Sequence, residues 1–372
     1  MKHWKNTVAV ALVSAMTLAS PALAATPAAQ TEERTVYTFE QVLEKATKNN
    51  SDLSLLEQNL DLMSRQSDNL NQTLGGEIYP SDPGYDVTPQ YETLRQLNNL
   101  MVQRQTSRYK KEALQKQLEY SVMTAMTTII TNEANLAMAD SQLKLYEDQA
   151  RLINTKKTLG MATELEVNQA EAQIQQYKTD MAKAQSDVDQ AYANLARLMG
   201  ISDTNFSVVY EPEYEPFVLN TDLNTYLAAK NQTNPTLEGA RLGAETLERN
   251  KSFDLANSTA LYTWDQLEYN ISQANANVKN AEDSYTKMGE ATYATVQQLE
   301  GTIAMLGTNL DLAESNLKVA QLNLQNGSGT QLDVDQAQNK VDTTKNALQE
   351  AKLNHANAVY LLENPCAAGS GQ

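Results

Sequence analysis

The chain has 372 residues, and its formal charge at neutral pH is −17 because 46 acidic residues outnumber 29 basic ones. Such an acidic composition argues against the binding of nucleic acid and of anionic lipid headgroups. With 14 glycines, 9 prolines and the single cysteine Cys366, the chain has the composition of long helices that pack together without an internal disulfide.

The first 24 residues have the features of a secretory signal peptide. Two lysines precede an apolar run over residues 8–18, and Ala22-Leu23-Ala24 provides a cleavage site. The run is too short to span a membrane. We therefore expect an exported protein with no direct membrane span, located in the periplasm or cell envelope or associated with the outer membrane.

Residues 25–37 are predicted to form a leader, and residues 38–206 a first helical repeat. Thr38 is placed to cap the first helix of that repeat. The segment Gly75–Tyr91 contains three prolines and is typical of a loop, whereas Glu92–Thr158 contains neither proline nor glycine. At 1.5 Å per residue, a continuous helix over the latter segment would be about 100 Å long.

The helix expected after this long helix, which would run back alongside it, carries a heptad pattern. We call the two helices the long arm and the returning arm of the repeat. Apolar residues recur in steps of three and four, which predicts a left-handed coiled coil with a neighbouring helix. Many of these residues are alanine, so the two helices should approach closely. Gly200 is expected to end the arm. The positions are Val167, Ala170, Ile174, Tyr177, Met181, Ala184, Val188, Ala191, Leu195 and Leu198.

An inter-repeat strap is predicted at residues 207–217, a second helical repeat at 218–363 and a tail at 364–372. The long arm of the second repeat is expected near Leu261–Gln325, with its glycines as weak points, and the returning arm over Leu332–Glu363. His355 occupies one of the heptad positions of that returning arm, which together form the seam that faces the neighbouring helix. We interpret it as a polar core residue rather than a metal ligand, because no second histidine lies near it in the sequence.

The turn between the two arms occurs twice, 167 residues apart. A glycine can end the long helix in the left-handed conformation, a threonine can cap the next helix, and an acid three residues later completes a capping box. The pattern predicts a tandem duplication of one helical hairpin. The two copies are Gly160-Met-Ala-Thr163-Glu-Leu165-Glu166-Val167 and Gly327-Ser-Gly-Thr330-Gln-Leu332-Asp333-Val334.

Two such repeats behind a signal peptide resemble the TolC-like outer-membrane efflux family over nearly the whole mature chain. The resemblance implies a homotrimer whose helices form a hollow α-barrel with a strap around its middle. It also implies that the hairpin tips dock a periplasmic adaptor (membrane fusion) protein of an inner-membrane ABC or RND-type pump. The docking residues implied in this way are Gly160, Thr163, Leu165, Gly327, Thr330 and Leu332.

Acidic residues just beyond the turn line a constricted entrance in some members of that family. The resemblance therefore implies a pore constriction at Glu166 and Asp333. Three residues after Asp333, where family members often have a second aspartate, this chain has Gln336. This departure puts a double acidic ring in doubt.

Family members also insert pairs of β-strands that together form a membrane barrel. A membrane strand needs about 9–11 residues of alternating pattern. Neither Gly75–Tyr91 nor Arg241–Trp264 shows such a pattern. The expected fold is therefore all-α: two tandem helical-hairpin repeats with very long coiled-coil helices, forming an α-barrel protomer with a small strap and no β-barrel.

The sequence shows no nucleophile constellation, phosphate-binding glycine loop or cluster of metal ligands, so we expect neither an enzyme nor a cofactor or metal. Three functions stay open at this point. They are a TolC-like envelope duct of a tripartite export system, a coiled-coil spacer of the envelope with no transport role, and a monomeric helical binding protein. The third is the weakest, because two long hairpins alone would have little core between them.

Overall fold

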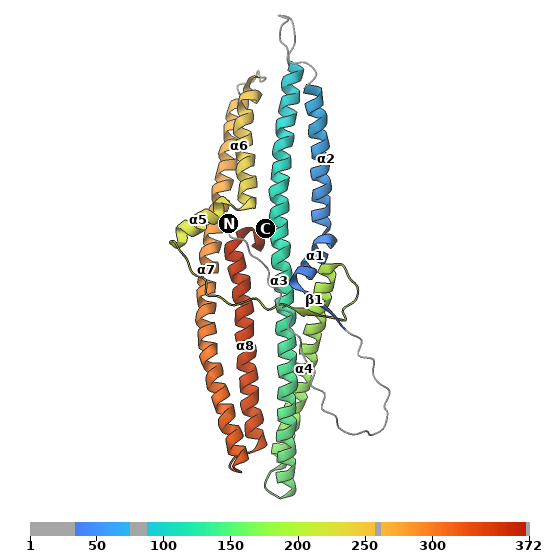
Figure 1. Ribbon diagram of the computed structural model, residues 1–372, viewed down its shortest axis with the longest axis vertical. Coiled ribbons are helices and arrows are strands. Elements are labelled where there is room, and N and C mark those ends of the chain that lie inside the picture. The colour runs from blue at the N-terminus through green and yellow to red at the C-terminus, as the bar shows by residue number, and fades with distance from the viewer. Residues whose placement is uncertain (1–33, 75–87, 257–261, 370–372) are drawn as a thin grey trace, which may run out of the picture. The chain divides into compact units, whose positions relative to one another are not determined.

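The computed structural model describes residues 34–74, 88–256 and 262–369, and it divides the chain into a unit of residues 1–34 and a unit of residues 35–372. The second unit is helical apart from two short strands, which confirms the expected all-α fold of two helical-hairpin repeats (Figure 1). Within the described ranges, no helix is both long and apolar enough to cross a membrane.

The first repeat begins with a strand and then holds two short and two long helical segments. Thr38 caps the first helix as predicted, in a capping box with Gln41, and Asn50 separates this helix from the next one. The elements are β1 (Thr35–Thr38), α1 (Phe39–Asn49), α2 (Ser51–Leu74), α3 (Thr88–Thr158) and α4 (Glu164–Met199).

The second repeat follows the same order and ends in a short 3-10 helix. Its first helix is capped by Asp222, whose side chain accepts a hydrogen bond from the Thr225 amide. The elements are β2 (Phe206–Val209), α5 (Leu223–Gln232), α6 (Pro235–Ala256), α7 (Tyr262–Gln325), α8 (Gln331–Glu363) and η1 (Pro365–Ala368).

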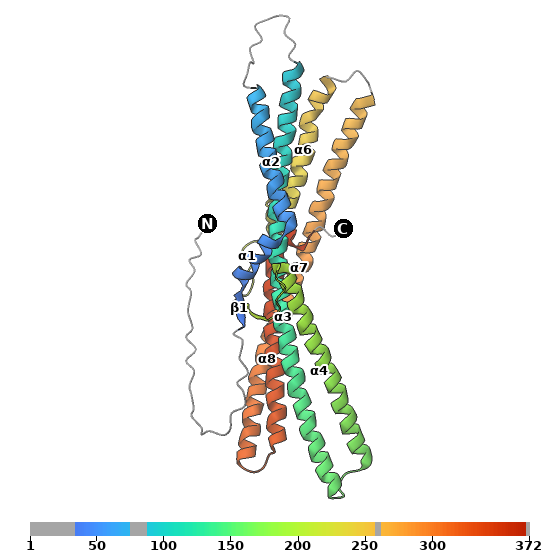
Figure 2. The same cartoon turned by 90° about the vertical axis from the view of Figure 1, so that its right-hand side faces the viewer.

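Helix α3 is the central element of the second unit. It packs against α4 in its own hairpin and against α8 of the other hairpin, while its N-terminal half packs between α2 and α6. Helix α7 packs mainly against α8 and α6. Figures 1 and 2 show that the turns of the α3–α4 and α7–α8 hairpins lie at the same end of the unit. The helices of that end therefore follow the order α4, α3, α8, α7.

The heptad prediction for α4 is confirmed by burial. Every predicted seam residue from Val167 to Leu198 is buried or half-buried, and between Val167 and Val188 all the other residues are exposed. Towards the C-terminus of α4 the seam widens into a core that includes Met126, Leu195 and Val42 of α1. The stripe thus holds most of α4 on α3, with α1 joining near the C-terminus of α4, and the opposite face of α4 is exposed.

The end of the predicted leader belongs to the fold. Residues Thr35–Thr38 form strand β1, which pairs in parallel with β2 so that Thr35 lies opposite Phe206. Phe206 is buried between Tyr37 and Tyr192, with ring centroids 5.5 and 5.1 Å away. The packing of Tyr37 on Phe206 therefore holds strand β1, at the start of the first repeat, against β2. The leader predicted for residues 25–37 therefore ends at Arg34.

The strap after β2 is fixed to the second hairpin. The carboxylate of Glu300 in α7 accepts a hydrogen bond of 2.6 Å from the Phe217 amide and lies 3.3 Å from the imidazole of His355. His355 is buried, and the ring of Tyr214 packs edge-on against it. The predicted core histidine thus has a specific structural partner in the strap.

Three other predicted segments need comment. Most of the proposed loop Gly75–Tyr91 lies outside the described residues, and α3 already begins at Thr88, with Pro89 in the first turn where proline is tolerated. The described part of Arg241–Trp264 is helical. The predicted tail contains η1, which packs on α3 and accepts a hydrogen bond from Gln117 at the carbonyl of Cys366.

The glycines of α7 do not interrupt the helix. At Gly289, a methyl group would lie only 2.4 Å from Cδ2 of Leu227, a fully buried residue of α5. Gly289 therefore permits a close approach of α5 to α7, which is a different role from the predicted weak point.

Candidate functional site

Both hairpin tips have the local structure that the sequence motif predicts. Gly160 and Gly327 have φ angles of 71° and 72°, in the left-handed region. After Gly160 the amide of Met161 donates to the carbonyl of Lys156, and after Gly327 the amide of Ser328 donates to that of Asn323. Each amide thus bonds to a carbonyl five residues earlier, which is the hydrogen bond of a Schellman motif at the end of a helix. Glycine adopts the left-handed conformation of this motif without the steric cost of a side chain.

The next helix at each tip starts with a reciprocal capping box. The Thr163 amide donates to the Glu166 carboxylate over 2.6 Å, and the Glu166 amide donates back to the threonine hydroxyl over 3.3 Å. Thr330 and Asp333 repeat this arrangement at 2.8 and 3.2 Å. Both acids therefore contact the N-terminus of their own helix. Their predicted role at a pore constriction stays a prediction.

These contacts make the tips sensitive to acid. Hydrogen bonds from the threonine backbone amides lower the pKa of Glu166 below 4.5 and that of Asp333 below 3.8. A lowered pKa means that each capping box contributes fully at neutral pH and loses its contribution as the pH falls through the lowered value.

We expect the amide resonances of Thr163 and Thr330 to shift on acidification, with midpoints below the ordinary values of the two acids. NMR titration of the labelled protein measures both midpoints. The variant Glu166→Gln keeps a side chain that can accept from the threonine amide but cannot titrate, so its Thr163 resonance should stay constant. A midpoint at or above 4.5 for Thr163 in the parent would contradict the capping geometry.

The two tips differ in surface chemistry. Leu159, Met161 and Leu165 are all exposed at the first tip, whereas Leu332 at the second tip is half-buried and its glycine is followed by Ser328. The motif identified Leu165 but not Leu159 or Met161, which could have been found as apolar residues on either side of Gly160 in a polar stretch. The first tip is therefore an apolar surface and the second a polar one.

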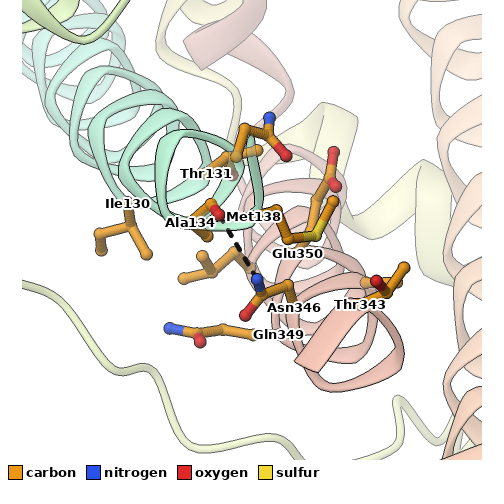
Figure 3. Close-up of a pocket in the computed structure, with 11 residues that line it drawn as sticks. Ile130, Thr131, Ala134, Met138, Thr343, Asn346, Gln349 and Glu350 are labelled. Atoms are coloured by element: carbon orange, nitrogen blue, oxygen red, sulfur yellow. Dashed lines mark hydrogen bonds between the residues drawn. The ribbon is translucent and has the colours of Figure 1, made fainter. Parts of the chain in front are cut away.

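A groove between the two repeats lies between α3 and α8. It encloses a cavity of about 110 Å³ lined by Ala134 and Met138 of α3 and by Thr343, Asn346 and Leu353 of α8. Figure 3 shows the amide of Asn346 reaching towards the backbone of α3, where it donates to the carbonyl of Ala134 over 3.4 Å. The groove is thus a close helix contact with a small gap.

Polar contacts continue along this interface towards the C-terminus of α8. Asn357 donates to the hydroxyl of Thr127 over 3.2 Å, and both residues are buried. The hydroxyl of Tyr360 donates to the Glu119 carboxylate over 2.7 Å, and burial together with that bond raises the pKa of Tyr360 far above its ordinary value. Such buried polar pairs fix the register of two helices.

The internal repeat gives this interface a counterpart that has no partner among the residues that the structure describes. Residues of α3 correspond to α7 at the same offset of 167 that relates the two turns, so Met138 and Leu145 correspond to Met305 and Leu312. The two α3 residues are half-buried, and Met138 lines the cavity towards α8. On α7, Met305, Leu312 and Val319 are 56%, 60% and 55% exposed at steps of seven residues.

Helix α4 shows the complementary difference. Leu353, Asn357 and Tyr360 of α8 are buried or half-buried at the α3 interface. Their counterparts on α4, which are Ser186, Gln190 and Ala193, are all exposed. Thus the contact between repeats covers a face of α3 in the first repeat and a face of α8 in the second, and the faces at the corresponding positions of α7 and α4 lie outside it. The outer faces of α7 and α4 remain open.

No protein-family model and no curated protein matches this sequence. Solved structures do match it. One match is CusC, from crystal structures on the conformational changes that accompany its folding and transmembrane channel formation. It has a TM-score of 0.67 and 15% identity over 89% of this chain and 92% of its own. The CmeC outer-membrane channel of Campylobacter jejuni has a TM-score of 0.62 and 12% identity, with 89% and 86% covered.

The MtrE outer-membrane channel of Neisseria gonorrhoeae, in its open state, is a third match, with a TM-score of 0.58 and 17% identity over 90% of this chain and 89% of its own. CmeC and MtrE are outer-membrane channels by description, and CusC is described through the formation of a transmembrane channel. The chain therefore has the TolC-like fold over about nine-tenths of its length, as the twin-turn motif predicted.

Proposed function

We propose that this protein is one protomer of a TolC-like envelope duct in a tripartite export system. The observation that carries the proposal is the repeated helix position: the helices that correspond to α3 and α8 are α7 and α4, and their outer faces are uncovered in the described part of the chain. The fold that this chain shares with channel proteins supports a duct rather than an enzyme.

The open faces are complementary to each other in a second copy of the chain. If α7 of one protomer met α4 of the next as α3 meets α8, the same head-to-tail contact would repeat from copy to copy, and it would form a ring provided that the rotation between copies closes. Covering Met305, Leu312 and Val319 would also remove a line of exposed apolar residues from water. Three copies are expected from the resemblance to the trimeric family.

The hairpin tips are the proposed docking surface for a periplasmic adaptor of an inner-membrane ABC or RND-type pump. The support is local: both turns begin with a glycine where an added Cβ would have open space, and the first turn presents three exposed apolar side chains. Apolar side chains at an exposed tip are suited to pack against a partner hairpin. Glu166 and Asp333 would then lie just inside the entrance.

Substitution of either tip glycine tests this docking surface. An added Cβ at Gly160 or Gly327 has no neighbour within 4 Å, so a large side chain there changes the tip surface without disturbing the packing. We expect Gly160→Trp and Gly327→Trp to abolish adaptor binding, measured by surface plasmon resonance with the adaptor of the same export system. The alanine variants carry the φ penalty of about 1–2 kcal/mol without the bulk and should keep part of the binding.

Asp333→Asn provides the matched control at the same tip. An amide at this position still accepts from the Thr330 amide, so docking should be unchanged, whereas the cation dependence of conduction in planar bilayers should change if the carboxylate lines the entrance. Unchanged adaptor binding by both tryptophan variants would overturn the docking surface and favour the alternative function, an envelope spacer without transport.

A further inference from the structure

The two hairpin tips lie at the same end of the unit, so one partner can reach both (Figures 1 and 2). At the first tip Leu159, Met161 and Leu165 are 68%, 72% and 65% exposed. At the second tip the residues equivalent to Leu159 and Met161 are Asn326 and Ser328. The duplication has thus kept the geometry of the turn at both tips, but exposed apolar side chains surround the glycine of only the first.

Local helix capping does not account for these exposed side chains. In a Schellman motif the residue after the glycine often packs on an apolar residue five positions earlier, but Met161 has Lys156 at that position. In a hydrophobic staple the residue before the cap packs on the residue four positions after the cap, and these two are Ala162 and Val167. Leu165 belongs to neither pair. The turn itself therefore does not require the three exposed side chains to be apolar.

Polar groups of the second tip are bonded within the tip. The carbonyl of Asn323 accepts from the backbone amide of Ser328 over 2.9 Å and from its hydroxyl over 3.2 Å. The side-chain amide of Gln331 donates to the carboxylate of Asp335 over 2.8 Å. A partner that took over these groups would gain little, because each new hydrogen bond would replace an existing one. The second tip is therefore suited to the rim of an interface and the first tip to its centre.

The two tips differ in charge as well. Helix α3 ends with Lys156 and Lys157, whereas α7 has no basic residue in its last turn. Lys157 forms an ion pair with Glu164, and Lys156 has no ion-pair partner within the described ranges of the chain. Its equivalent at the second tip is Asn323. A chain with 46 acidic residues thus leaves this cation exposed beside the apolar tip, where it complements a partner that carries a carboxylate.

The size of the first tip indicates how far a partner must extend. A stable interface buries about 800 Å² on each partner. Three side chains at one tip supply only part of this area, so the contact must continue over the neighbouring second tip. A bulky residue at either tip glycine would then block the same partner, although only the first tip presents exposed apolar side chains.

We propose that the first tip is the binding hot spot for the adaptor. Leu159, Met161 and Leu165 pack on an apolar surface of the adaptor, and Lys156 faces a carboxylate at the edge of that surface. The second tip lies in the polar rim of the same contact. This inference rests on the proposed function, and it adds that the two tips of a protomer are not equivalent binding sites.

Exchange of residues between the tips tests this inference with little risk to the fold. The double variant of Leu159→Asn and Met161→Ser gives the first tip the residues that the second tip carries in the same turn. We expect its affinity for the purified adaptor of the same export system, measured by surface plasmon resonance, to fall about 30-fold or more. The matched double variant of Asn326→Ala and Ser328→Ala should change the affinity by less than about threefold.

Replacement of Lys156 by asparagine tests the charge. Asparagine is the residue that the second tip carries at this position. Adaptor affinity of Lys156→Asn should fall about tenfold at low salt and depend less on salt than that of the parent, because a screened charge pair is lost. Lys144→Asn, which removes an exposed lysine paired with Asp140 elsewhere on α3, should leave both properties unchanged. Circular dichroism should show the parent's helical signal and unfolding midpoint for every variant.

Two results would overturn the inference and leave the docking surface itself intact. One is parent-like adaptor binding by the double variant of Leu159→Asn and Met161→Ser when Gly160→Trp abolishes binding. The other is an equal loss of affinity in the double variant of Asn326→Ala and Ser328→Ala, which would make the two tips equivalent. A parent chain that did not bind the adaptor at all would instead overturn the proposed function, and the hot spot with it.

Discussion

Replacement of Gly200 by alanine should destabilise the protein by roughly 3–5 kcal/mol, far more than the same replacement at either hairpin tip. All three glycines have φ near 70°, so each alanine variant carries a backbone penalty of about 1–2 kcal/mol. Only at Gly200 does the new Cβ also meet another side chain, that of Asn49, at 2.2 Å. Overpacking of this kind adds about 1–3 kcal/mol, and displacing Asn49 loses its two hydrogen bonds to α4.

Urea denaturation of Gly200→Ala and Gly327→Ala, followed by circular dichroism, measures the difference. A double-mutant cycle separates strain from most of the collision, because Asn49→Ala removes the two atoms nearest the new Cβ, at 2.2 and 2.4 Å, and leaves only the Asn49 Cβ at 3.0 Å. In that background the cost of Gly200→Ala should fall towards the backbone penalty of about 1–2 kcal/mol. Equal destabilisation by Gly200→Ala and Gly327→Ala would show that Asn49 moves aside freely and does not hold α1 on α4.

The features that could be predicted from sequence are those set by local geometry. The buried stripe of α4 follows from apolar residues at steps of three and four, which fall on one face of a helix. The hairpin tips follow from a glycine, a threonine and an acid within seven residues. Capping boxes at Thr163 and Thr330 therefore have the expected partners. Each of these predictions needed only one helix and its nearest neighbour.

Features that depend on two distant segments were missed. The pairing of β1 with β2 brings Thr35 to Phe206, and nothing in a four-residue strand specifies a parallel partner so far along the chain. The second covered face of α8 was also missed, although Leu353 and Tyr360 lie off its heptad seam. Their counterparts on α4, Ser186 and Ala193, are small, and comparing the repeats residue by residue would have revealed the difference.

Substitution of Leu312 by glutamate should abolish self-association of the protein while leaving the fold of the protomer intact. Leu312 is 60% exposed in the chain, at the centre of the line from Met305 to Val319 on the open face of α7. In the proposed ring this face is covered by α4 of the next protomer. Burying a leucine there contributes about 1.5–3 kcal/mol, and a buried, unpaired carboxylate would add a further penalty.

Each contact in the ring should therefore weaken by about 100-fold or more, since every 1.4 kcal/mol corresponds to a factor of ten. Analytical ultracentrifugation of the parent, Leu312→Glu and Leu165→Glu, each with and without the adaptor, tests this expectation. Leu165 is similarly exposed but lies at the tip, so Leu165→Glu should lower adaptor binding and leave self-association unchanged. The two variants thus separate assembly from docking.

Circular dichroism provides the control for folding, because an exposed leucine on one helix face contributes little to the protomer by itself. Leu312→Glu should retain the helical signal and unfolding midpoint of the parent measured as a monomer. If this variant assembled as well as the parent, the outer face of α7 would not be the contact between copies. If the parent stayed monomeric even with the adaptor, the open faces of α7 and α4 would not form a contact between copies. That result would overturn the proposal that the protein is a protomer of an envelope duct.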